Sequence, residues 1–256
     1  MIDPKYFKRV KIVPSAAIKM VMHAQAGVEK GVKQSGKPVE IMGLLFGRID
    51  TEDLNCIIIS DAQPAPMPRP IVLEGGGLEE RSEVEVAAVE SDNDSTQQID
   101  YMLSYQSNFE LTRKERLCGW YHSHPNELDM YSHCNLSSAD LTTQLSWQQS
   151  KDPYLPFIAI VIDPLRSLAK GVPEIMAFRA YPPDYSAPLN ETPDGTFVTD
   201  EPTRVKQWGS CWNRFYKLNI TYIMSSLARA TLGTLKNQFL WQNALSSTPM
   251  LEQGKL

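Results

Sequence analysis

Apolar positions along the chain change their spacing several times, and each spacing predicts a different element. Apolar residues recur at turn spacing over residues 14–29, which predicts a helix. Short apolar runs predict strands at about 39–48 and 55–61. A continuous apolar run over 157–162 fits a strand buried on both faces, and 175–181 predicts another strand. Elements in this order predict an α/β fold with a mixed sheet flanked by helices.

The C-terminal part of the chain has a different composition. Residues 186–203 lie in a stretch rich in Pro, Asn, Asp, Thr and Gly, which predicts a linker between a domain at 1–185 and a helical segment at 204–256. One helical stripe is expected in that segment, because apolar residues fall at i, i+4, i+7 and i+11: Tyr216, Ile220, Ile223 and Leu227. This helix could pack on its own domain or against other proteins.

Charge and cysteine content argue against several classes of protein. The formal net charge is −5 and the sequence pI is about 5.5, which argues against general nucleic-acid binding. The 4 cysteines show neither zinc-finger spacing nor a disulfide framework, so we expect a reducing compartment. The sequence has no apolar run of about 18 residues that would predict a membrane span, and its first residues do not resemble a secretory signal. We therefore expect an intracellular protein that binds neither nucleic acid nor membranes.

Two histidines one residue apart are the most informative polar positions. They follow apolar residues 117–121, which predict a strand. Because residues i and i+2 of a strand project from the same face, His122 and His124 could bind one metal ion while Ser123 turns away. Many such histidine pairs bind no metal in proteins, so the pair alone is weak evidence for a metal site.

A carboxylate follows the histidines in a second informative pattern. Ser137, with Asp140 three residues later, is typical of a helix start in which the serine is the N-cap and the acid reaches back. Helix capping and metal binding are compatible, because Asp140 in the first turn of the helix can also face a metal. Glu40 stands at the beginning of a predicted strand, where it could be a solvated strand end or a catalytic base.

Taken together, Glu40, the two histidines with the proline after them, and Ser137-X-X-Asp140 resemble the motif of the JAMM (MPN-plus) metalloprotease family. The resemblance implies the MPN/JAMM fold, a cytidine-deaminase-like mixed sheet flanked by helices, with a C-terminal helical extension. It also implies one Zn²⁺ per chain, bound by His122, His124 and Asp140. Glu40 would be the general base, and Ser137 would help to hold the attacking water and the reaction intermediate.

Further stretches, including 119–125 and 177–182, are similar to the members of this family that act in the COP-nine signalosome. That resemblance implies a zinc isopeptidase that removes the ubiquitin-like modifier NEDD from cullins, in the cytoplasm and nucleus. It implies other signalosome subunits as partners, including a catalytically silent MPN partner, contacted through the MPN domain and the C-terminal helices. Two alternatives stay open: cleavage of ubiquitin chains, as in the proteasome lid, and a silent MPN scaffold.

Two inserts are expected in the domain, and the second of them along the chain departs from the family pattern. Residues 126–133 replace a shorter family loop and form either a solvated loop or a further contact to zinc through one of three side chains: Glu127, Asp129 and His133. Residues 74–100 are polar and glycine-rich, which predicts a mobile loop. The resemblance implies that a glutamate of this loop can occupy the zinc in a resting state. Glu79 is the best local match for such an autoinhibitory contact.

Overall fold

The computed structural model describes residues 5–65, 111, 114–125, 134–150, 156–227, 229, 230 and 233. The chain divides into two compact units, Met1–Thr221 and Tyr222–Leu256. The inserts predicted at 74–100 and 126–133, with Glu79 and the three side chains of the second insert, lie outside the described residues. Their suggested contacts to a metal stay predictions.

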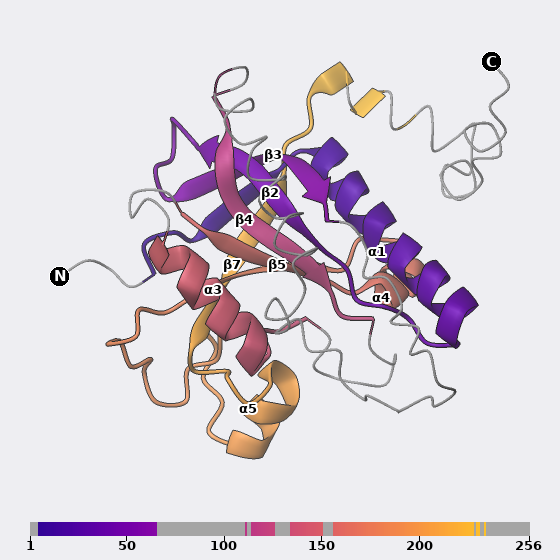
Figure 1. Ribbon diagram of the computed structural model, residues 1–256. Helices are drawn as coiled ribbons and strands as arrows, with labels where there is room; N and C mark the ends of the chain where they lie inside the picture. The colour runs from indigo at the N-terminus through magenta and orange to yellow at the C-terminus, as the bar shows by residue number, and fades with distance from the viewer. Residues whose placement is uncertain are drawn as a thin grey trace, which may run out of the picture. The chain divides into compact units, whose positions relative to one another are not determined.

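The first unit contains both strands and helices, as Figure 1 shows. In chain order the elements are β1 (Arg9–Ile12), α1 (Pro14–Ser35), β2 (Met42–Ile49), β3 (Cys56–Pro64), β4 (Arg116–Ser123), α3 (Ser138–Ser150), β5 (Ile158–Ile162), α4 (Pro164–Lys170), β6 (Ile175–Ala180), α5 (Glu201–Trp208) and β7 (Phe215–Tyr222). The strands close into a barrel in the order β1-β3-β2-β4-β5-β6-β7. β1 pairs with β3 and β4 with β5 in parallel, whereas the other pairs given by the register are antiparallel. The predicted mixed sheet is confirmed.

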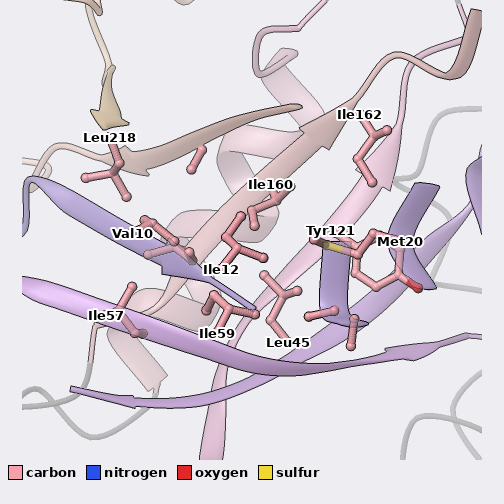
Figure 2. Packing of buried hydrophobic residues seen from close by; sticks show 14 of the residues in the cluster. Val10, Ile12, Met20, Leu45, Ile57, Ile59, Tyr121, Ile160, Ile162 and Leu218 are labelled. Carbon is pink, nitrogen blue, oxygen red and sulfur yellow. The ribbon is translucent and has the colours of Figure 1, made fainter. Parts of the chain in front are cut away.

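One face of the strands packs against α1 in the larger hydrophobic cluster. Figure 2 shows strand side chains such as Val10, Leu45 and Ile160 pointing toward one another and toward Met20 of α1. All five residues of β5 are buried, as the continuous apolar run predicted. Burial of each large aliphatic side chain contributes about 1.5–3 kcal/mol. This cluster fixes α1 and the central strands as one unit.

The other face of the strands carries a second cluster, which α3 and the aromatic residues around α5 cover. Trp120 of β4, Phe157 and Phe178 are fully buried there, together with Leu141 of α3. Figure 1 shows α1 and α3 on different sides of the strands. α3 packs against β5 and β6, and its first turn comes close to the end of β4, where Asp140 Oδ2 lies 3.4 Å from His122 Nε2.

The prediction of one helical stripe beginning at Tyr216 is wrong over Phe215–Tyr222, which form β7. Tyr216, Leu218 and Ile220 all pack on the larger cluster, so the apolar positions follow a period of two as well as the helical spacing. The first half of β7 pairs with β6, and beyond it the Asn219 N–H donates to the carbonyl of Lys8 at 2.9 Å. Residues assigned to a separate C-terminal segment therefore belong to the barrel.

Helical residues come later, at 226, 227, 229, 230 and 233. Among the residues that the structure describes, none of the helices has the length and apolar character needed to cross a bilayer.

Candidate metal centre

The two histidines lie where β4 ends. His122 pairs with Val161 of β5, and the backbone N–H of His124 donates to the carbonyl of Ile162 at 2.8 Å, which extends the pairing past the last residue of the strand. Strand alternation directs both rings to one face, and their Nε2 atoms are 3.0 Å apart. The His122 ring is fully buried and His124 is 8% exposed. The two imidazoles are therefore held together in a largely dry site.

The predicted capping box at the start of α3 is confirmed. The backbone N–H of Asp140 donates to Ser137 Oγ at 3.1 Å, and the backbone N–H of Ser137 donates to Asp140 Oδ2 at 2.9 Å. The same Oδ2 lies 3.4 Å from Nε2 of His122 and 3.5 Å from Nε2 of His124. Asp140 thus caps its helix and faces the histidines at the same time.

These three side chains form a buried group that could hold a metal ion. Their ligand atoms lie within 4.8 Å of one another, and all three residues are buried. Burial alone would raise the pKa of the Asp140 carboxyl, but the charges and hydrogen bonds of His122 and His124 outweigh burial and hold that pKa well below its usual range. Two imidazole nitrogens and one carboxylate oxygen suit Zn²⁺ and leave a coordination position for water.

Glu40 lies two residues before β2, close enough to His124 and Asp140 for their charges to act on its carboxyl. Burial raises the pKa of its carboxyl to about 7; the charge of His124 opposes the rise and that of Asp140 adds to it. The next residue, Ile41, is held to β4 because its N–H donates to Ser123 Oγ at 3.0 Å. A carboxyl with a pKa near neutrality can both accept and return a proton, so the geometry suits acid–base chemistry.

The structure brings together five of the residues that the sequence singled out: Glu40, His122, His124, Ser137 and Asp140. Sequence reasoning missed two buried neighbours of the group, Trp120 and Gln144. Each had a local signal. Trp120 stands two residues before His122 on the same strand face, and Gln144 stands one helical turn after Asp140.

Comparisons with known proteins give the site a family context. Residues 79–153 match the family model described as JAB1/Mov34/MPN/PAD-1 ubiquitin protease. Over 253 residues the chain is 38% identical to COP9 signalosome complex subunit 5b of Arabidopsis thaliana, covering 98% of this chain and 59% of the relative. It is 38% identical over 249 residues to subunit 5 of Dictyostelium discoideum, with 97% and 63% covered. For subunit 5 of Drosophila melanogaster the identity is 35% over 250 residues, with 97% and 64% covered. The chain thus spans about three fifths of the length of these relatives.

Proposed function

We propose that this chain, of which residues 79–153 match the JAB1/Mov34/MPN/PAD-1 family model, is a zinc-dependent isopeptidase of the COP9 signalosome. One observation carries the proposal. The buried group of His122, His124 and Asp140 lies beside a glutamate whose pKa is about 7, in a chain similar over nearly its whole length to signalosome subunit 5. In this proposal the three buried side chains hold the zinc.

A bound zinc would supply a Lewis acid that lowers the pKa of a coordinated water and polarises a carbonyl. Glu40 takes the proton of the attacking water and later passes it to the leaving amine, which is a lysine side chain of the modified protein. The bond that is cut is therefore an isopeptide bond. The raised pKa of the Glu40 carboxyl supports this role, because the same group must be a base in one step and an acid in the next.

Ser137 would stabilise the developing oxyanion. Its Oγ already accepts the backbone N–H of Asp140, so its hydroxyl hydrogen remains available to donate in another direction. The side chain is exposed, which fits a group that must meet a substrate. A donor aimed at developing negative charge lowers the barrier of acyl transfer.

The proposed substrates are cullins modified with the ubiquitin-like protein NEDD, and the proposed partners are the other signalosome subunits, including a silent MPN subunit. Both follow from the similarity to signalosome subunit 5. We also propose that the protein is located in the cytoplasm and nucleus. The description of the matching family as ubiquitin proteases favours one alternative, which is cleavage of ubiquitin chains by the same residues.

Cleavage assays distinguish these possibilities. The zinc-loaded chain is incubated with NEDD-modified cullin and with a ubiquitin chain, alone and after assembly with the other signalosome subunits, and Glu40→Gln is the inactive control. Selective release of NEDD supports the proposal, and selective cleavage of ubiquitin supports the alternative. No cleavage of either substrate in the assembled state would indicate a silent scaffold.

A further inference from the structure

An aromatic ring lies directly against one of the candidate metal ligands. The indole of Trp120 stacks on the imidazole of His122, with ring centroids 4.5 Å apart and an angle of 14° between the planes. Both side chains are fully buried. The two residues are i and i+2 on β4, so strand alternation brings them to the same face.

A buried amide on α3 holds this indole in place. The Trp120 Nε1–H donates to Gln144 Oε1 at 2.8 Å. Gln144 in turn donates from Nε2 to the carbonyl of Phe157 at 2.8 Å and to Gln148 Oε1 at 3.1 Å. Gln144 is fully buried, so each of these hydrogen bonds is costly to lose. One side chain therefore connects α3 to β4 and to the residue before β5.

The second ring nitrogen of His122, Nδ1, does not orient the ring through a hydrogen bond to any described residue. A metal-binding histidine usually donates its other ring N–H to a carboxylate or carbonyl, which fixes the orientation of the ring. In the described part of the chain, the buried Nδ1 of His122 has no hydrogen-bond partner. Among the described residues, the His122 imidazole is therefore oriented by ring contacts: its face stacks on Trp120, and it meets the ring of His124 edge-on at 4.7 Å between centroids.

We infer that Gln144 and Trp120 are positioning residues of the metal centre, an inference that rests on the proposed metal site. Gln144 fixes the indole, and the indole fixes the imidazole of His122. Because Gln144 lies one turn after Asp140, the same hydrogen bonds also fix the start of α3 relative to β4. Neither residue touches the reacting atoms. Their function is to hold His122 Nε2 close to Asp140 Oδ2, at 3.4 Å, so that both side chains would be in place to bind the metal.

Gln144→Met tests the inference because methionine has nearly the shape of glutamine and cannot make the hydrogen bonds. Gln148→Met is the matched control on the same helix: it removes the bond to the carbonyl of Ala180 and the one accepted from Gln144 Nε2, but it leaves the bonds that join Gln144 to Trp120 and Phe157. Co²⁺ is titrated into each metal-free protein, because its visible absorption reports the coordination geometry. Chemical unfolding of the metal-free proteins measures their stability separately.

We expect Gln144→Met to weaken Co²⁺ binding about 10- to 100-fold, the usual effect of losing an outer contact of a metal site, and to change the absorption spectrum. Gln148→Met should keep the affinity and spectrum of the wild type. Trp120→Phe, which keeps a ring and deletes the N–H, should change the spectrum in the same direction. This variant tests the inference even if Gln144→Met does not fold.

Two different failures are distinguishable. Folded Gln144→Met and Trp120→Phe proteins with the affinity and spectrum of the wild type would overturn the positioning function. The positioning function would also be overturned if Gln144→Met and Gln148→Met lost affinity equally and each in proportion to its loss of stability. That result would indicate that Gln144 has only a structural function. If the wild type itself binds no Co²⁺, the proposed metal site fails.

Discussion

Ser123 and Ile41 are joined by two hydrogen bonds across β4 and the segment before β2. The Ser123 N–H donates to the Ile41 carbonyl at 3.0 Å, and the Ile41 N–H donates to Ser123 Oγ at 3.0 Å. Ser123 stands between the two histidines, and Ile41 directly follows Glu40. The serine in the middle of the motif therefore fixes the proposed base relative to the proposed metal ligands.

Ser123→Ala should lower turnover more than it lowers metal affinity. The change leaves the N–H of Ile41 buried without its acceptor, which costs about 1–3 kcal/mol, and it frees the backbone beside Glu40. The backbone bonds of Ser123 and His124 persist, so the histidines should keep their places. Metal affinity, turnover and the free energy of unfolding are measured on the same preparation.

Ser167→Ala is the matched control for this experiment. Ser167 Oγ also accepts a backbone N–H, from Glu174 at 2.9 Å, but it lies on α4 and takes no part in the candidate site. This variant should lose stability and keep turnover once folded. Equal turnover in the two variants at matched folded concentration would contradict the positioning of Glu40 through Ser123.

Glu40→Gln should abolish turnover and leave metal binding intact. The amide cannot take a proton from water, and the metal-binding group of His122, His124 and Asp140 does not include this residue. Loss of a general base lowers the rate about 10²- to 10⁴-fold. Single-turnover cleavage and the metal content of the purified variant are the two measurements. Turnover within a few-fold of the wild type would remove Glu40 as the base.

Asp140→Asn should lower metal affinity strongly while α3 keeps its start. The amide oxygen can still accept the N–H of Ser137, but it lacks the negative charge that the imidazoles and a cation require. Far-ultraviolet circular dichroism should show the helical content of the wild type, and equilibrium dialysis should show little bound Zn²⁺. Wild-type zinc content in this variant would exclude Asp140 as a ligand.

Local signals in the sequence were sufficient for much of the fold and for the candidate ligands. The helix from Pro14, the buried strand at 158–162 and the capping box of Ser137 with Asp140 each depend on residues close in the chain. The pairing of Trp120 with Gln144 joins residues 24 positions apart, and only the packing of α3 on β4 brings them together. The local spacing places each residue on the same face as a candidate ligand, but it does not predict that the two side chains contact each other.

The wrong prediction has a different cause. Tyr216 and Ile220 are four residues apart, which fits both a helical stripe and one face of a strand. Leu218 lies between them and favours the strand, because it is fully buried and pairs with Ala177 of β6. Tertiary pairing decides such a segment, since β6 offers the unpaired edge that β7 completes.

His23 gives the fold a dependence on pH that is separate from the metal centre. Its Nδ1 lies 3.0 Å from the hydroxyl of Tyr121, and burial lowers its pKa from 6.5 to about 4. Between these two pH values His23 is protonated in the unfolded chain but remains neutral in the folded protein. The free energy of unfolding should therefore fall as the pH falls from 6.5 to about 4, by at most about 1.4 kcal/mol per pH unit.

His23→Gln removes this proton uptake. Urea unfolding of the metal-free proteins at several pH values should show a shallower loss of stability in the variant below pH 6.5, whatever the cost of the substitution at higher pH. All other groups are the same in the two proteins, so their contributions cancel in the difference. The same slope in both proteins would mean that His23 is protonated in the folded state as readily as in the unfolded chain. In that case the contact between α1 and Tyr121 accommodates the charge.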